Sequence, residues 1–184
     1  MGCRGTYRWP SLGACRTIRS VTIRVLVTGG TFDKQYNELD GTLAFGETNV
    51  EHMLGRGRSR LGVVTEVLMM VDSLEMTAAQ RQRIVTACGE CAETQVVITH
   101  GTDTMVETAQ AIAAARLAKT VVLTGAMVPY VFGSSDGLFN LGSALSFVQV
   151  LPHGVYVAMN GRWFPWEDVR KNRELGVFER VSGG

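Results

Sequence analysis

The chain has 184 residues, 46% of them hydrophobic and 19% charged, with a formal net charge of +1. This length fits one domain. The near-neutral charge does not favour a nucleic-acid partner, which commonly goes with a basic patch and a pI above about 9. No run of about 18 apolar residues occurs, so no membrane-spanning segment is predicted. We expect a soluble protein that recognises a small ligand and has no nucleic-acid or membrane partner.

The first twenty residues carry four arginines and two cysteines without periodicity and lack the continuous apolar stretch of a secretory signal. We predict a disordered or extended tail over residues 1–20 and a folded domain over residues 21–184. Without a signal, the expected location is cytoplasmic, where thiols stay reduced. This expectation covers all four cysteines, Cys3, Cys15, Cys88 and Cys91.

From residue 23 onward, short β-branched runs alternate with segments of helical periodicity. The runs are mostly apolar throughout, which is typical of parallel strands buried on both faces. In chain order we predict a strand at 23–27, a short helix at 47–54, a strand at 66–71, a helix at 77–93, a strand at 95–99, a helix at 103–118, a strand at 120–124, a helix at 137–150 and a strand at 154–159. This alternation predicts an α/β fold with a doubly wound, mostly parallel sheet flanked by helices, as in Rossmann-like or flavodoxin-like three-layer domains.

Two local patterns add detail to this fold. Thr77 and Gln80 form a capping-box pattern at the start of the helix predicted at 77–93. Residues 32–62 are rich in Gly, Asn, Asp and Arg, a composition that suits a mobile segment over a site better than it suits the core. We therefore expect a lid in this segment.

Two threonine-rich turns follow predicted strands, residues 28–31 (Thr-Gly-Gly-Thr) and 99–104 (Thr-His-Gly-Thr-Asp-Thr). Ligands of open α/β sheets bind at the carboxyl ends of the strands, so both turns are predicted to converge on one small polar molecule. The Thr31 hydroxyl is a candidate nucleophile once a base takes its proton. The alternative is a tight turn in which Thr31 only caps the following segment. The dinucleotide fingerprint is incomplete, the histidines are scattered, and neither cofactor nor metal is expected.

Three more side chains have both a structural and a chemical interpretation. Asp103 follows Thr102 at the start of a predicted helix, where it is either a plain N-cap, worth about 1 kcal/mol, or part of a site. Lys171 lies in the charged stretch 167–174, where it is either solvated or a base beside Thr102. Tyr36 either packs or offers its phenol from the lid segment.

Four fragments in this order resemble the bacterial-type L-asparaginases over roughly residues 23–179. They are residues 26–31, residues 99–104, Thr124-Gly-Ala-Met127, and Ser135-Asp-Gly137 with Asn140-Leu141. The resemblance implies that Thr31 is the primary nucleophile and Tyr36 its lid partner. It implies a second catalytic group made of Thr102, Asp103 and Lys171. The implied reaction converts L-asparagine to L-aspartate and ammonia through an acyl-enzyme intermediate.

The resemblance also implies the substrate contacts. Ser73 would hold the α-carboxylate, with further contacts from Asp72, Gly30 and Gly101, and the chain would self-associate, most simply as a homodimer. The chain departs from the family in two ways: it has no residues for the C-terminal domain of larger members, and Leu74 stands where a polar substrate contact, typically glutamine, is usual. A short, single-domain branch with weaker affinity for asparagine is therefore expected.

Four alternatives compete with this interpretation. Gly133–Gly137 has the Gly-x-Ser-x-Gly pattern of a serine hydrolase with Ser135 as nucleophile, but Pro129 and loop residues separate it from its strand. Cys88 and Cys91 match a redox or metal half-site, although buried thiols are the commoner outcome. The chain could also be a non-catalytic amino-acid-binding regulatory module. The last alternative is an asparaginase-like subunit of a transfer-RNA amidotransferase.

Overall fold

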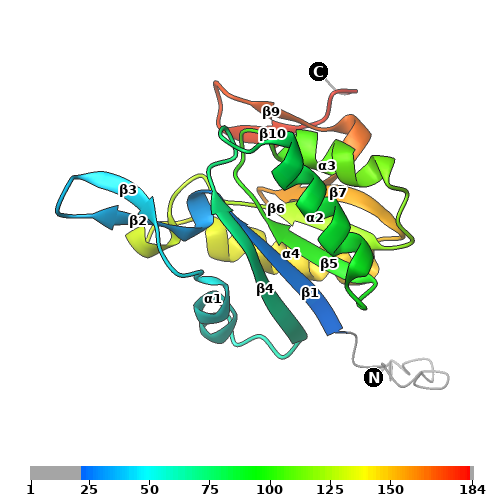
Figure 1. Cartoon of the computed structure of the whole chain (residues 1–184), viewed down its shortest axis with the longest axis horizontal. Helices are drawn as coiled ribbons and strands as arrows, with labels where there is room; N and C mark the ends of the chain where they lie inside the picture. The colour runs from blue at the N-terminus through cyan, green and yellow to red at the C-terminus, as the bar shows by residue number, and fades with distance from the viewer. Residues whose placement is uncertain (1–21, 183–184) are drawn as a thin grey trace, which may run out of the picture.

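The structure is a computed structural model that describes residues 22–182. Its main feature is a six-stranded sheet in the order β4-β1-β5-β6-β7-β8, with helices on both faces (Figure 1). The first five of these strands are parallel, and β8 is antiparallel to β7. The prediction of a mostly parallel α/β sheet flanked by helices is therefore confirmed. The predicted tail, residues 1–20, lies outside the described residues.

The elements of this sheet and its helices follow the predicted alternation. The strands are β1 (Thr22–Gly29), β4 (Gly62–Val71), β5 (Gln95–Thr99), β6 (Thr120–Thr124), β7 (Gly154–Met159) and β8 (Arg162–Pro165). The helices are α1 (Val50–Arg56), α2 (Ala78–Glu90), α3 (Met105–Ala114) and α4 (Gly137–Val150). The capping box of Thr77 and Gln80 is present at the start of α2. Within residues 22–182, no helix is long and apolar enough to cross a membrane.

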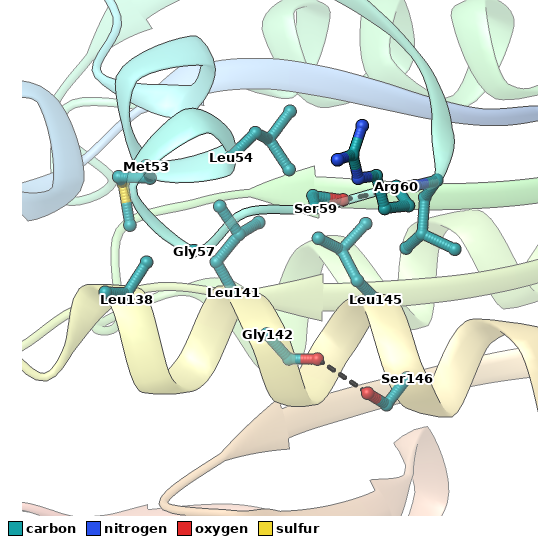
Figure 2. A pocket seen from close by; sticks show the side chains of 11 residues that line it. Met53, Leu54, Gly57, Ser59, Arg60, Leu138, Leu141, Gly142, Leu145 and Ser146 are labelled. Carbon is teal, nitrogen blue, oxygen red and sulfur yellow. Dashed lines mark hydrogen bonds between the residues drawn. The ribbon is translucent and has the colours of Figure 1, made fainter.

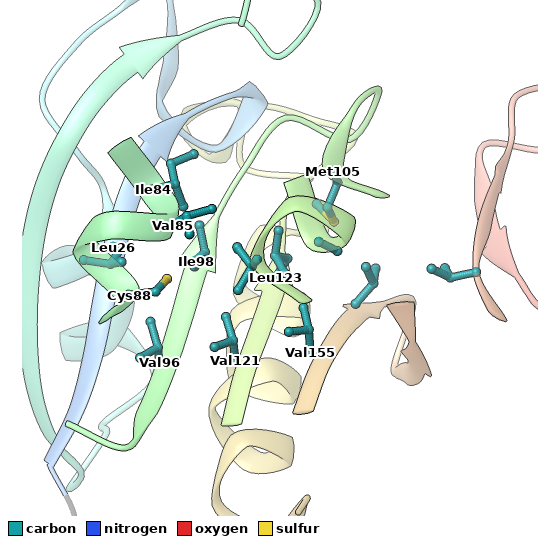
Figure 3. Packing of buried hydrophobic residues seen from close by; sticks show 14 of the residues in the cluster. Leu26, Ile84, Val85, Cys88, Val96, Ile98, Met105, Val121, Leu123 and Val155 are labelled. Carbon is teal, nitrogen blue, oxygen red and sulfur yellow. The ribbon is translucent and has the colours of Figure 1, made fainter. Parts of the chain in front are cut away.

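Alternate residues of the buried strands face two separate cores. On one face, α2 and α3 pack against side chains such as Leu26, Ile98 and Leu123, as Figure 3 shows. On the other face, α1 and α4 pack against Val25, Val97 and their neighbours. Because the central strands are covered on both sides, their sequences are mostly apolar on both faces.

The fold differs from the sequence prediction at its margins. Strand β4 begins at Gly62 instead of 66 and lies at the edge of the sheet, where Val64 and Val67 are 40% and 49% exposed. Helix α3 begins at Met105 instead of 103, because the preceding turn continues to Thr104. The prediction also missed β8 and two small hairpins, β2 (Lys34–Asn37) with β3 (Thr42–Phe45) and β9 (Arg170–Asn172) with β10 (Val177–Glu179).

The predicted lid segment divides into two structurally different parts. Its first part is the hairpin β2–β3, which extends from the body of the domain in Figure 1 and has Leu39 exposed near its tip. Its second part contains α1, whose Val50 and Met53 are fully buried in the core beside α4. The expectation of a segment outside the core was therefore wrong for α1, since apolar side chains at i and i+3 give this short helix a buried face.

The burial of α1 predicts a measurable contribution to stability. Met53→Ala should lower the free energy of unfolding by about 2–5 kcal/mol, since it leaves a cavity in a packed core. Leu39→Ala is the matched control on the same segment, because the Leu39 side chain is 92% exposed. This variant should change the free energy of unfolding by no more than about 0.5 kcal/mol. Urea unfolding of both variants checks this. Equal effects would show that α1 is not part of the cooperative core.

Candidate active site

Three turns at the carboxyl ends of neighbouring strands touch one another through glycine. Gly30 follows β1 with a φ of 77°, and a Cβ atom at this position would lie 2.4 Å from the backbone nitrogen of Gly101, after β5. A Cβ atom on Gly101 would in turn lie 2.4 Å from Oγ of Ser73, after β4. Only residues without side chains at positions 30 and 101 allow the turns to approach so closely. The two threonine-rich turns thus meet, with Ser73 beside them.

The hairpin β9–β10 brings Lys171 to this meeting point. Lys171 Nζ donates to Thr102 Oγ1 at 2.8 Å and to Asp103 Oδ1 at 2.9 Å, and its side chain is only 12% exposed. Phe178 of β10, which pairs with Lys171, is buried and anchors the hairpin to the core. The N-cap of α3 is Thr104, so Asp103 is not a plain helix cap. The structure therefore joins three of the predicted site residues in one ion-paired cluster.

Thr31 lies across the glycine contact from this cluster. It is the first residue of a short 3₁₀ helix, Thr31–Asp33, and is half-buried. Among the hydrogen bonds of residues 22–182, none involves the hydroxyl or the amide of Thr31. A hydroxyl and an N–H group are thus free at the point where the turns meet, as a site for a carbonyl-containing ligand requires.

Tyr36 is not part of the cluster in this conformation. It lies on β2, is 59% exposed, and its hydroxyl lies beside Gly41 at the far end of the hairpin. In the part of the chain that the structure describes, this hydroxyl makes no hydrogen bond with another residue. The position of the hairpin explains this, since β2 and β3 extend away from the sheet (Figure 1).

Asp72 and Ser73 face the cluster from the turn after β4. Ser73 is buried, and its carbonyl oxygen accepts a hydrogen bond of 2.8 Å from the Thr104 hydroxyl. The Asp72 carboxylate pairs with Lys34 Nζ and accepts from the Leu74 amide at 3.0 Å. The Lys34 hydrogen bond is the main cause that holds the pKa of Asp72 below its ordinary value. This pair links the base of the hairpin β2–β3 to the turn after β4, a link that the sequence did not reveal.

Thr28 and Asp168, which lie in the predicted site segments, make hydrogen bonds that stabilise the fold. Thr28 Oγ1 donates to the Thr99 carbonyl at 2.8 Å, which joins β1 to β5. The Asp168 carboxylate accepts from Arg180 and Ser182 near the end of the described residues. Their hydrogen bonds assign both side chains to the framework.

The structure weighs against the serine-hydrolase alternative. Ser135 Oγ donates to the Val128 carbonyl at 2.6 Å and accepts from the Gly137 amide at 2.9 Å. Asp136 accepts from the Met127 and Val128 amides. These residues form the cap in front of α4, and the Ser135 hydroxyl is not presented to a base.

The cysteine pair is likewise part of the framework. Cys88 is buried, and burial raises the pKa of its thiol to about 12. Cys91 is half-buried, so the expectation of two buried thiols holds for Cys88 alone. Lys119 Nζ lies 3.2 Å from the Cys91 sulfur. Residues 22–182 contain no group of three or more His, Cys, Asp or Glu side chains that could hold a metal ion.

A separate groove of about 300 Å³ lies between α1 and α4. Figure 2 shows that its walls are mostly leucine side chains, with Arg60 and Ser59 at one end. None of the candidate catalytic residues lines it. The polar cluster at the sheet edge, and not this groove, is therefore the candidate active site.

The fold and the cluster together define an α/β domain with hydroxyl, amine and carboxylate groups at the carboxyl edge of its sheet. Residues 22–179 match the family model described as Asparaginase, N-terminal. The chain belongs to the asparaginase family.

Individual relatives agree with this assignment. An L-asparaginase of Thermococcus kodakarensis is 30% identical over 158 residues, which are 83% of this chain and 48% of that protein. A probable periplasmic L-asparaginase of Haemophilus influenzae is 30% identical over 165 residues, 84% of this chain and 47% of that protein. The crystal structure of a probable cytoplasmic L-asparaginase from Campylobacter jejuni superposes with a TM-score of 0.77 at 30% identity, covering 89% of this chain and 54% of that one. The chain thus spans about half the length of the relatives that it matches.

The glycine contact predicts a specific weak point. Gly30→Ala should lower the free energy of unfolding by about 2 kcal/mol more than Gly41→Ala, because only the first places a Cβ atom against backbone. Both glycines have a positive φ, so both variants carry a backbone cost, and the ψ of −171° at Gly30 adds to the cost there. Thermal unfolding of the two variants measures the difference. A difference near zero would contradict a rigid contact between the turns.

Proposed function

We propose that this chain carries the catalytic half-site of an L-asparaginase, which hydrolyses L-asparagine to L-aspartate and ammonia. The observation that carries the proposal is the Lys171–Thr102–Asp103 cluster beside the turn that contains Thr31. The free Thr31 hydroxyl lies on a turn that touches the turn of Thr102, whose hydroxyl is paired with an amine. This arrangement suits a reaction in which one oxygen attacks a carbonyl and another group moves the proton.

The reaction proceeds in two stages. Thr31 Oγ1 attacks the side-chain amide carbon of asparagine, the C–N bond breaks, and the nitrogen leaves as ammonia after it gains a proton. Water then attacks the aspartyl ester on Thr31, which releases L-aspartate and restores the hydroxyl. In both stages negative charge develops on the carbonyl oxygen, and the free amides of Thr31 and Thr102 are the donors that stabilise it.

The second group moves the protons. Lys171 and Asp103 fix the Thr102 hydroxyl. In the first stage this hydroxyl takes up the proton released by Thr31 while its own proton passes to the leaving nitrogen. In the second stage it takes up a proton from the attacking water and returns one to Thr31. Tyr36 is proposed as the lid partner of Thr31, which requires the hairpin β2–β3 to close toward the site from the position seen here.

The substrate would be held by its α-substituents. Ser73 is proposed to bind the α-carboxylate, and Asp72, Gly30 and Gly101 to supply further contacts. L-Asparagine is thus the proposed small-molecule partner. Self-association as a homodimer is proposed too, since two-fold homodimers are the commonest oligomers of soluble proteins. A cytoplasmic location stays a prediction, since the names of the relatives include both compartments.

Ammonia release from L-asparagine tests the proposed function directly. Thr31→Ala and Thr102→Ala should each lower kcat at least about a thousandfold, as expected for a nucleophile and its proton-transfer partner. Thr65→Ala is the matched control, because it removes a hydroxyl that binds Glu51 in the middle of β4. This variant should keep the activity of the unaltered chain.

The same samples separate hydrolysis from binding. Activity that survives in Thr31→Ala would contradict the proposed nucleophile. If the unaltered chain releases no ammonia while L-aspartate still raises its melting temperature, the binding-module alternative replaces hydrolysis.

Leu74 gives a prediction about affinity. Its side chain is mostly exposed at the turn that carries Ser73, in a position where family members usually place a polar contact. Leu74→Gln should lower the KM for L-asparagine about three- to tenfold with little change in kcat, which corresponds to one added hydrogen bond of about 1 kcal/mol. Leu74→Met adds no such bond and should leave both constants unchanged. Identical kinetics for the two variants would contradict a missing contact.

A further inference from the structure

A buried network of hydrogen bonds lies behind the Gly101–Thr102 peptide. It begins at Arg81 on α2, whose Nη1 donates to Thr108 Oγ1 at 2.9 Å. Thr108 Oγ1 lies 2.8 Å from His100 Nε2, and His100 Nδ1 lies 2.8 Å from the Gly101 carbonyl oxygen. His100 and Thr108 are fully buried. We call Arg81, Thr108 and His100 the positioning network, since it connects a surface helix to the turn that carries Thr102.

The chemistry of Arg81 sets the direction of every bond in the network. A guanidinium only donates, so Thr108 accepts from Arg81 and keeps its own proton for another acceptor. That acceptor is His100 Nε2, because the other neighbour is the weakly accepting sulfur of Met76 at 3.9 Å. The neutral imidazole then carries its proton on Nδ1 and donates it to the Gly101 carbonyl.

The charge state of His100 is consistent with this assignment. Burial, aided by the positive charge of Arg81, lowers the pKa of His100 to about 4 although its bond to the Gly101 carbonyl opposes the shift. At neutral pH the ring is therefore uncharged and has one proton to place. The network determines which nitrogen holds it.

The orientation of one peptide follows from the His100 bond. In a trans peptide the carbonyl and the next N–H point in opposite directions, so a Gly101 carbonyl held by His100 turns the Thr102 N–H away from that ring. Among the hydrogen bonds of the described residues, none uses the Thr102 amide as donor. The network thus keeps this amide free for a ligand at the meeting point of the turns.

We propose that Arg81 is a positioning residue, which acts through Thr108 and His100 to hold the Gly101–Thr102 peptide in its productive orientation. The inference rests on the proposed function, in which the Thr102 amide stabilises the developing oxyanion. Arg81 Nη1 also donates to Thr104 Oγ1 at 3.2 Å, and Thr104 binds the Ser73 carbonyl. One guanidinium therefore steadies both the oxyanion donor and the turn that carries Ser73.

The competing explanation is a surface ion pair. Arg81 Nη2 also donates to Glu107 Oε2 at 2.8 Å, and the Glu107 side chain is 60% exposed. Such pairs contribute little to stability. Glu107→Gln removes this charge and leaves the Nη1 bonds in place, so it is the matched control for Arg81→Met.

Nitrogen-15 NMR of the imidazole rings tests the network without any substrate. The unaltered protein should show His100 as the Nδ1–H tautomer, distinguishable because the chain has only three histidines. Thr108→Val removes the donor to Nε2 and should abolish this single-tautomer signal, and Arg81→Met should perturb it and shift the Thr102 amide resonance. Glu107→Gln should change neither. A His100 with its proton on Nε2 in the unaltered protein, or unchanged signals in Arg81→Met, would overturn the proposal.

Kinetics on the same variants connects the network to the reaction. Arg81→Met and Thr108→Val should each lower kcat about tenfold with KM within twofold, and the double variant should be no slower than the slower single one, because both act through His100. Arg81→Lys keeps a donor and should retain most of the activity. If Arg81→Met does not fold, Thr108→Val against Arg81→Lys carries the kinetic test. Multiplicative losses in the double variant would overturn the proposal. If the unaltered protein releases no ammonia, the proposed function fails, and the NMR measurement alone decides on the network.

Discussion

The contact between the Gly30 and Gly101 backbones is the constraint on which the site depends. Two strands of a parallel sheet place their following turns side by side, but a side chain on either glycine would force the turns apart. The contact places the turn of Thr31 directly against the turn of Thr102. Ser73 fills the remaining side of Gly101, so the geometry of three turns follows from two residues without Cβ atoms.

The sequence predicted the parts of the fold that have a strong period. The central strands are mostly apolar because helices cover both faces, and α4 lies at the predicted residues 137–150. It did not predict the hairpins β2–β3 and β9–β10, because their strands have only three or four residues and the first strand of each hairpin is polar, like a loop. Their position depends on a few distant contacts, such as buried Phe178, which no local pattern reveals.

The candidate site was predictable only in part for the same reason. Thr31 and Thr102 were identifiable because they follow strands, whereas Lys171 was distinguished from the charges around it only by family resemblance. Its contact with Thr102 depends on the hairpin β9–β10, which brings β9 to the turn after β5 and which no local sequence pattern shows. No sequence pattern marked Arg81 as part of a buried network, since a helical arginine four residues after the N-cap Thr77 is usually a solvated side chain. Its partial burial becomes evident only when α2 and α3 are packed together.

Two lysine–aspartate pairs give the site a balanced charge. Lys171 pairs with Asp103 on one side, and Lys34 pairs with Asp72 on the other. Each pair neutralises itself, so the turns between them carry local positive and negative groups without net charge. For the proposed ligand, an amino acid with an α-ammonium and an α-carboxylate, a site without net charge is the better match, because a net charge of either sign would repel one of the two charged groups.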